Sequence, residues 1–188
     1  MRLFTAVWPP DEAVAALAGA LAPPPWHPAG HWRPVPPVTW HLTLCFHGDD
    51  DPDRRAGALD VAFAGVTAPR LRFAGLGTFP GVVWAGVDQH PDQHPDQQLD
   101  RHNAGTDQQA AGPVGDLRDL AARAGADPSS FRAHLTLARR ARGDRRRPVL
   151  VSGAALGAGP WWRPAEVLLV RSDPGPRYTP IHRVVLGR

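Results

Sequence analysis

The sequence predicts an α+β protein with two related halves. Strand-like and helix-like segments follow one another in the approximate order β-α-β-α-β-β, insertion, α-β-(short)-β-β. The tetrapeptide HLTL occurs at residues 41–44 and again at 134–137. Composition alone is not expected to produce the same four residues twice in a chain of this length. Because strand, helix and HLTL strand recur, the pattern suggests two related lobes.

The first quarter of the chain gives the clearest local signals. Residues 2–8 (RLFTAVW) are rich in β-branched and aromatic residues, predict a strand, and end at Pro9-Pro10. Residues 11–21 predict a helix, because an acidic pair occupies the first turn, where negative charge suits the helix dipole. Residues 23–38 contain too many prolines for regular structure and predict a loop. Residues 40–47, which include the first HLTL, predict a strand.

The same criteria give the remaining elements. Helices are predicted at residues 52–64 and 116–125, the second ended by Gly125. Strands are predicted at residues 70–79, 82–87, 133–138, 165–171 and 182–187. The short segment 149–156 is compatible with either a helix or a strand, and residues 139–147 (RRARGDRRR) predict an arginine-rich loop.

Residues 88–113 differ from the rest of the chain. They are polar, low in complexity and include a tandem DQHP repeat. Such a segment does not bury enough apolar surface to fold alone, so we expect an exposed, mobile insertion. Its histidines are compatible with a metal site, but the prolines and the lack of a packed frame favour a solvated loop. No metal or cofactor is therefore expected.

Charge and cysteine content narrow the function classes. The net charge is only +3, yet the pI is near 10.3 because all 21 cationic residues are arginines. This balance is compatible with an anionic substrate. Cys45 is the single cysteine, which excludes an internal disulfide and any multi-cysteine zinc site. No apolar run has the length of a membrane span, and no signal peptide is recognisable, so we expect a soluble, cytoplasmic protein. The sequence gives no signal for the oligomeric state, and a monomer is our default expectation.

The HLTL strands carry the chemistry. Successive side chains of a strand point to opposite faces, so His41 and Thr43 share one face while the two leucines anchor the other. His134 and Thr136 repeat this arrangement. If the two strands met across a cleft, two imidazoles and two hydroxyls would surround one tetrahedral phosphate. One neutral and one protonated histidine can then divide an in-line displacement between them, without a metal.

The paired motifs resemble those of the 2H phosphoesterase superfamily. The segments MRLFTAVWPP, WHLTLCFHG, LRFAGLGTFPGVVWAGV, FRAHLTLARR and AEVLLVRSDPGPRYTPIHRVVLG resemble its RNA 2′,3′-cyclic phosphodiesterase branch, also called the 2′-5′ RNA ligase family. The resemblance covers nearly all of residues 1–188 except the insertion. It implies one domain of two pseudo-symmetric lobes, each an antiparallel sheet with helices outside, around a central groove.

The resemblance also implies a reaction. A 2′,3′-cyclic phosphate at an RNA end, tRNA fragments included, would be hydrolysed to a terminal 2′-phosphate. His41 would donate a proton to the departing 3′ oxygen, and His134 would act as the base toward water. Thr43 and Thr136 would hold the phosphoryl oxygens, and Arg139 matches a family arginine that contacts substrate. Attack by a 5′-hydroxyl in place of water would form a 2′-5′ linkage, which we expect as a side activity.

Strict alternation makes further predictions about the motif strands. It places Cys45 and His47 on the same face as His41, and His47 is then either a third imidazole near the groove or a strand-end residue. It places Arg139 on the face opposite His134, so that Arg139 reaches the phosphate only if the strand twists or ends there. Among the candidate base-stacking residues Trp8, Phe46 and Tyr178, it places Phe46 in the core.

Two alternatives to this enzyme remain open from the sequence. One is a non-catalytic module that binds nucleotides or RNA in the same groove. The other is a phosphodiesterase that acts on a small cyclic nucleotide. The arginines at 140, 142 and 145–147 are compatible with an RNA backbone contact and equally with a solvated basic loop.

Overall fold

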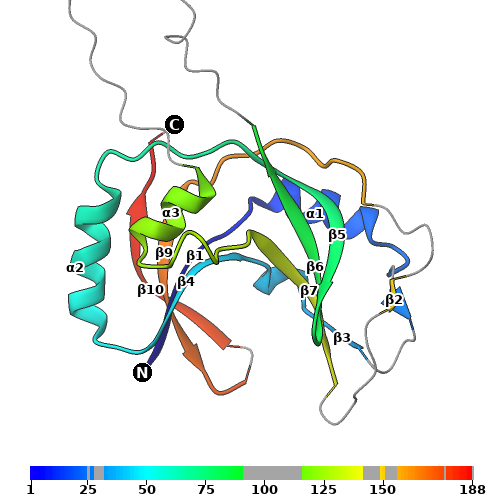
Figure 1. Cartoon of the computed structure of the whole chain (residues 1–188), viewed down its shortest axis with the longest axis horizontal. Coiled ribbons are helices and arrows are strands. Elements are labelled where there is room, and N and C mark those ends of the chain that lie inside the picture. The colour runs from blue at the N-terminus through cyan, green and yellow to red at the C-terminus, as the bar shows by residue number, and fades with distance from the viewer. Residues whose placement is uncertain are drawn as a thin grey trace, which may run out of the picture.

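A computed structural model describes residues 1–24, 26–27, 32–90, 116–141, 149–150, 156–175 and 177–187 (Figure 1). The described part is an α+β fold dominated by one large antiparallel sheet, which confirms the predicted class. The elements are β1 (Arg2–Val7), α1 (Asp11–Ala20), β2 (Trp26–His27), β3 (Trp32–Pro34), a 3₁₀ turn (Pro37–Thr39), β4 (Leu42–Asp49), α2 (Pro52–Phe63), β5 (Leu71–Phe79), β6 (Val82–Gln89), α3 (Leu117–Arg123), β7 (His134–Arg140), β8 (Val149–Leu150), β9 (Glu166–Asp173) and β10 (Arg177–Val185).

The sheet has two halves that meet at the HLTL strands. The strand order is β10-β9-β1-β4-β7-β6-β5, with β3 also paired to β7. We call β1, β4, β9 and β10 the β4 half, and β3, β5, β6 and β7 the β7 half. A single residue pair, Leu42 with Leu135, joins them. Figure 1 shows the β4 half on the left and the β7 half on the right. The sheet is continuous, and the expected division into two pseudo-symmetric lobes stays a prediction.

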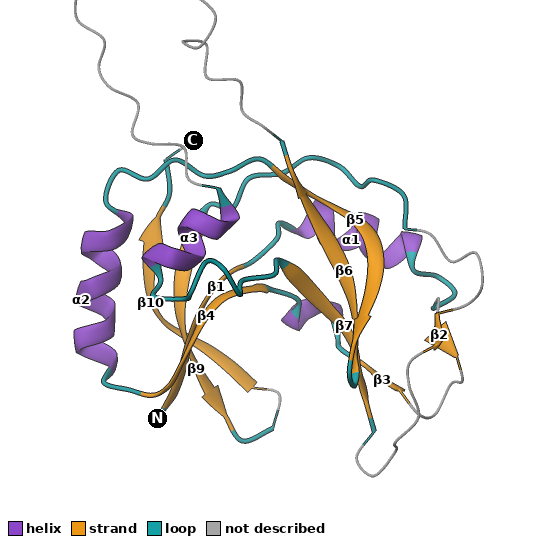
Figure 2. Ribbon diagram, viewed as in Figure 1, coloured by secondary structure: helices purple, strands orange, loops and turns teal. Residues whose placement is uncertain are grey.

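The helices cover one face of this sheet (Figure 2). α2 packs against β10, α3 against β4 and α1 against β5. Asp51 and Asp116 cap α2 and α3 by accepting a hydrogen bond from the backbone N–H three residues on, at 2.8 and 2.6 Å. Such caps satisfy an otherwise free donor of the first turn and stabilise a helix by about 1 kcal/mol.

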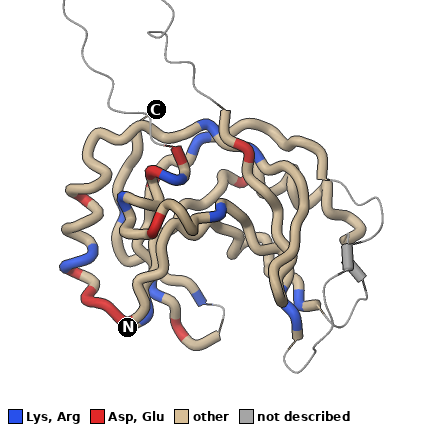
Figure 3. The backbone as a smooth tube through the Cα atoms, in the orientation of Figure 1, with Lys and Arg blue, Asp and Glu red and all other residues tan. Residues whose placement is uncertain are grey.

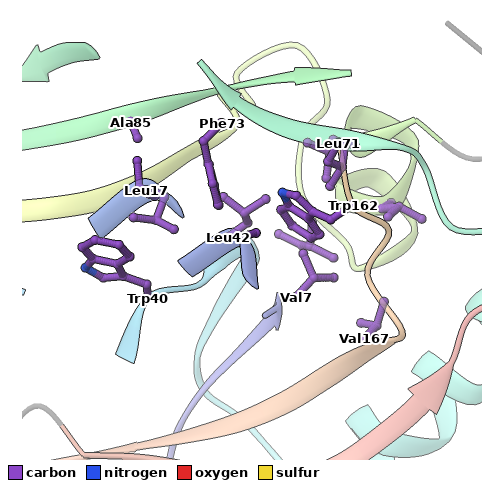
Figure 4. Packing of buried hydrophobic residues seen from close by; sticks show 14 of the residues in the cluster. Val7, Leu17, Trp40, Leu42, Leu71, Phe73, Ala85, Trp162 and Val167 are labelled. Atoms are coloured by element: carbon purple, nitrogen blue, oxygen red, sulfur yellow. The ribbon is translucent and has the colours of Figure 1, made fainter. Parts of the chain in front are cut away.

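The main core lies between the helices and the sheet (Figure 4). It combines leucines of both HLTL strands with apolar residues of all three helices and with Trp32, Trp40 and Trp162. Burial of each leucine contributes roughly 1.5–3 kcal/mol. The opposite side of the sheet, which we call the open face, carries a smaller apolar cluster on the β4 half, made of Phe4, Ala6, Leu168 and Val170.

Several predicted boundaries shift in the structure. β6 continues to Gln89, so the first two residues of the expected insertion complete a strand that pairs with β5. β10 begins at Arg177 rather than 182, and it forms a hairpin with β9. Of segment 149–156, residues 149–150 form a short strand beside β2. Residues 91–113 and 142–148, which include most of the insertion and of the arginine-rich loop, lie outside the described residues.

None of the helices in the described part of the chain is both long enough and apolar enough to cross a membrane. The expectations of a cytoplasmic location and a monomeric state stay predictions.

Candidate active site

The two HLTL motifs lie on neighbouring strands. Leu42 is paired directly with Leu135, and these side chains are only 1% and 0% exposed on the helix side of the sheet. The residues on either side of each leucine therefore point to the open face. Continuing the antiparallel register by one step sets His41 across from Thr136, and Thr43 across from His134. The structure thus brings all four motif residues onto one face, each of them half-buried.

Both imidazole rings are held in the same way. Nδ1 of His41 lies 2.7 Å from the carbonyl oxygen of Thr39, and Nδ1 of His134 lies 2.8 Å from that of Arg132. A carbonyl oxygen only accepts hydrogen bonds, so each Nδ1 carries the hydrogen and donates it. In the neutral ring Nε2 is then the basic nitrogen. Each motif therefore presents a fixed imidazole whose Nε2 gains or loses the proton.

His41 lies in an aromatic setting. Trp8 stacks on it with ring centroids 4.9 Å apart, and Phe4 and Tyr178 lie 5.2 and 5.1 Å away. Burial lowers the pKa of His41, and the nearby positive charges of Arg139 and His134 lower it further, while the Thr39 hydrogen bond acts in the opposite direction. Arg139 and His134 both belong to β7, so the charges that act on His41 come from the other motif strand.

His134 is framed by the β5–β6 hairpin. Phe79 meets it edge-on at 5.1 Å, and Trp84 lies 6.4 Å away. The Trp84 indole lies across Gly77 on the neighbouring strand, where a Cβ would fall 2.0 Å from the ring. Only glycine leaves room for the indole at that position. Gly77 of β5 therefore allows the Trp84 ring to lie beside His134.

An extra residue in β7 moves Arg139 onto the open face. Trp84 pairs with Thr136 and Val83 with Ala138, so Leu137 has no partner on β6 and forms a bulge. Leu137 and Ala138 are both buried, and the alternation restarts one residue late. Arg139 is therefore exposed on the same face as His134 and Thr136. The bulge, and not a twist or an end of the strand as expected, therefore turns Arg139 to the face of His134.

The first motif contains the same bulge, which overturns two predictions. Ala6 pairs with Thr43 and Thr5 with Cys45, so Leu44 is the unpaired residue. Cys45 consequently turns into the core at 8% exposure, although strict alternation placed it beside His41. Phe46, predicted to be core, is 76% exposed and lies 6.0 Å from Phe4. Strict alternation failed because one inserted residue exchanges the two faces.

His47 is not a third imidazole of the site. Its Nε2 lies 2.7 Å from the hydroxyl oxygen of Thr5, which is fully buried. Burial, followed by the positive charge of Arg55, lowers the pKa of His47 to about 4, although Asp50 acts in the opposite direction. His47 thus satisfies a buried hydroxyl on the helix side of the sheet, so its predicted placement on the face of His41 was wrong. Of its two interpretations, the strand-end residue agrees with the structure.

Sequence reasoning missed Arg33. This residue lies in the segment predicted to be a loop, but β3 pairs with β7 and sets Arg33 directly across from Arg139. Paired residues of neighbouring strands share a face, so Arg33 also points to the open face, where it is exposed. Figure 3 shows arginines where β3 and β7 run together. The available signal was Pro34, since the residue before a proline favours extended backbone.

Within the described ranges, no three His, Cys, Asp or Glu side chains gather in the way a metal site requires. Among the arginines of the basic loop, Arg140 ends β7, and Arg142 and residues 145–147 lie outside the described residues.

Comparison with known proteins identifies the family. Residues 7–84 match the model of the LigT-like phosphoesterases. The chain is 32% identical over 196 residues to an RNA 2′,3′-cyclic phosphodiesterase of Thermus thermophilus, covering 99% of this chain and 90% of that protein. A crystal structure of a protein from Thermus thermophilus has a TM-score of 0.64 at 30% identity, covering 99% of this chain and 98% of the other. Escherichia coli LigT complexed with ATP has a TM-score of 0.64 at 25% identity, covering 100% and 98%. On its sequence and its fold, this chain belongs to the LigT-like phosphoesterase family.

Proposed function

We propose that this protein hydrolyses 2′,3′-cyclic phosphates at RNA ends to terminal 2′-phosphates, using His41 and His134 as its acid and base. The observation that carries the proposal is the matched pair of imidazoles on one sheet face, each fixed by a carbonyl through Nδ1. The relative from Thermus thermophilus that bears the name RNA 2′,3′-cyclic phosphodiesterase supports the choice of substrate.

The proposed reaction is an in-line displacement at phosphorus. His134 takes a proton from water through Nε2 as the water oxygen bonds to phosphorus. The bond from phosphorus to the 3′ oxygen breaks, and His41 gives that oxygen a proton. The product carries a 2′-phosphate and a free 3′-hydroxyl. Thr43 and Thr136 donate hydrogen bonds to the phosphoryl oxygens, and Arg139 balances the negative charge that grows in the transition state.

The lowered pKa of His41 requires an explanation, because an acid must be protonated before it acts. In the free protein, burial and the neighbouring positive charges favour the neutral ring. A bound phosphate brings a negative charge to the same place, which raises the pKa and favours the protonated ring. Substrate binding would therefore load His41 with its proton. The pH profile of kcat should accordingly extend to higher pH than that of kcat/KM.

The deciding experiment measures turnover of a uridine dinucleotide that ends in a 2′,3′-cyclic phosphate, with phosphorus NMR to identify the product. We expect a 2′-phosphate, formed equally fast with and without EDTA. A 3′-phosphate, a requirement for a divalent metal ion, or tight binding without turnover would overturn the proposal. The last result would instead support the non-catalytic nucleotide-binding alternative.

A second substrate tests the division of labour between the histidines. When sulfur replaces the 3′ oxygen, the leaving group is a thiolate, which departs without a proton because thiol pKa values are near 8.5. The activity of His41→Ala should then recover markedly, while that of His134→Ala should not. Recovery of His134→Ala alone would reverse the two roles.

The same site also supports ligation. A 5′-hydroxyl in place of water would lose its proton to His134, bond to phosphorus and leave a 2′-5′ linkage when the 3′ oxygen departs. Because water is present in large excess, we expect ligated product only at high concentrations of 5′-hydroxyl RNA, and we expect it to disappear in the same histidine variants.

A further inference from the structure

The pairing of Arg33 with Arg139 is electrostatically unusual. The two residues face each other directly across β3 and β7, and both are exposed on the open face. Like charges directly opposite on neighbouring strands destabilise a sheet. Among the described residues, neither guanidinium has a carboxylate partner. Two unneutralised cations side by side form a binding site for an anion with several oxygens.

β3 is firmly attached at this position. Trp32, the residue before Arg33, is paired with Arg140 and is buried in the main core. The backbone N–H of Val35 donates to the carbonyl oxygen of Leu137 at 2.8 Å. These anchors on both sides fix the backbone of Arg33, so its position beside Arg139 is a property of the sheet and not of a free loop.

The pair lies one short step from the proposed catalytic centre. Because Leu137 is the bulged residue, Arg139 stands only two paired positions beyond Thr136, which is roughly 7 Å along the strand. Arg139 is also close enough to lower the pKa of His41. A second phosphate held by Arg33 would therefore lie about one nucleotide away from a cyclic phosphate held by the histidines.

We infer that Arg33, together with Arg139, binds the phosphodiester that precedes the terminal cyclic phosphate of an RNA strand. This inference rests on the proposed function and adds to it a binding site for the linkage to the second nucleotide. A mononucleotide has no such phosphodiester and would leave Arg33 unused. The protein should therefore prefer RNA ends of two or more nucleotides over small cyclic nucleotides, which separates two substrate classes that the sequence alone left open.

The test compares three substrates: uridine 2′,3′-cyclic phosphate, the uridine dinucleotide with the same end, and that dinucleotide with an uncharged methylphosphonate linkage. For the unaltered protein, we expect kcat/KM to be at least tenfold higher on the charged dinucleotide than on the other two. A charge-assisted hydrogen bond has a strength that corresponds to about that factor or more. Equal rates on the charged and the methylphosphonate dinucleotide would overturn the inference.

Arg33→Ala should lower kcat/KM on the charged dinucleotide to nearly the mononucleotide value and leave the mononucleotide rate within about twofold. For Arg33→Ala, the slope of log KM against log salt concentration should also be smaller by about one than for the unaltered protein. Arg118→Ala, which removes the same charge from the outer surface of α3, is the matched control and should keep the preference. An undiminished preference in Arg33→Ala, or equal losses on both substrates, would contradict the assigned role.

Calorimetric binding of the dinucleotide product, which ends in a 2′-phosphate, tests the arginine pair independently of turnover. Arg33→Ala should bind it at least tenfold more weakly than the unaltered protein, and equal affinity would reject the inference. If no cyclic phosphate is turned over by the unaltered protein while this difference in affinity persists, the proposed function fails and the phosphodiester site stands. Thermal unfolding should show no loss of stability in Arg33→Ala, because the substitution removes a like-charge contact.

Discussion

The two motif strands share a scaffold. β4 and β7 each anchor a buried leucine in the main core, each contain an extra residue at the second leucine of HLTL, and each hold the histidine Nδ1 on a backbone carbonyl two residues earlier. The leucine anchors follow from the repeated tetrapeptide, whereas the extra residues also depend on how β1 and β6 pair with the motif strands. They place the two imidazoles in equivalent positions on the open face.

The surroundings of the two strands differ. His41 packs against rings from β1, β10 and Trp8, whereas His134 meets rings of the β5–β6 hairpin. Five residues after each histidine, the β4 strand presents Phe46 and the β7 strand presents Arg139. The repeat therefore sets geometry, while distant parts of the chain set the chemistry of each copy.

The largest expected effect tests whether the two histidines are equal partners. His41→Ala and His134→Ala should each lower kcat on the cyclic dinucleotide by roughly 10²–10⁴-fold, because each removes one proton transfer. The double variant should be little worse than either single one, since the two residues act as a unit. Circular dichroism should show unchanged folding. If one single variant kept full activity, the two-histidine mechanism would be wrong.

A smaller effect on activity is expected from substitutions of Arg139, the cation that β7 presents. Arg139→Ala should lower kcat/KM by about 10- to 100-fold, the range for a hydrogen bond to a charged group, and Arg139→Lys should recover part of it. The same substitution should raise the pKa of His41, measured by NMR titration of its ring, because a positive charge that lowers this pKa is removed. An unchanged titration of His41 would show that the two residues do not share a site.

Substitutions of Phe46, the ring that β4 presents, should reduce activity less than those of Arg139. Phe46→Ala is expected to raise KM for the dinucleotide by up to about tenfold, because stacking with a base is lost. The KM of Phe46→Leu should lie between those of the unaltered protein and of Phe46→Ala. Because Phe46 is exposed, its removal should change the free energy of unfolding by no more than about 0.5 kcal/mol. If Phe46→Ala instead lost roughly 3–5 kcal/mol in its free energy of unfolding, as measured with denaturant, Phe46 would be a core residue, as strict alternation predicted.

The smallest expected effect concerns acid stability. The pKa of His47 is lowered to about 4 in the folded protein, against an ordinary value near 6.5, so the unfolded chain binds the proton more readily. The contribution of His47 to the free energy of unfolding is therefore complete above about pH 6.5, and it is lost as the pH falls from there toward 4. His47→Gln should make the decrease in urea midpoint between pH 7.5 and 5 less steep. An identical decrease in both proteins would exclude this role for His47.

Much of the fold followed from local sequence signals. The α+β class, the three described α-helices and seven of the ten described strands were predicted from periodicity, capping residues and prolines, while β2 and β3 were missed and β8 was left open between helix and strand. The alternation within HLTL also placed His41 with Thr43, and His134 with Thr136, on one face of their own strand. These predictions succeeded because they depend on neighbouring residues along the chain. The expectation that the two strands face each other across a cleft was wrong, because they are neighbours in one sheet.

The errors concern properties set by other strands. A bulge at Leu44 and Leu137 depends on how β1 and β6 pair with the motif strands, and nothing in HLTLCF or HLTLAR shows it. Cys45 and Phe46 were therefore assigned to the wrong faces, and Arg139 reached the open face by a route that alternation excluded. Arg33 was missed because its strand consists of only three residues and exists through pairing with β7.

The bulges also give the site a direction. A symmetric pair of strands would accept a nucleotide equally well in either of two orientations related by a half-turn. Here the second residue past each bulge points away from the core, and it is a ring in one copy, Phe46, and a cation in the other, Arg139. A nucleotide has a flat base at one end and a charged linkage at the other, so only one of the two orientations matches both contacts. Under the proposed function, the duplicated framework would therefore bind the terminal nucleotide in one orientation only.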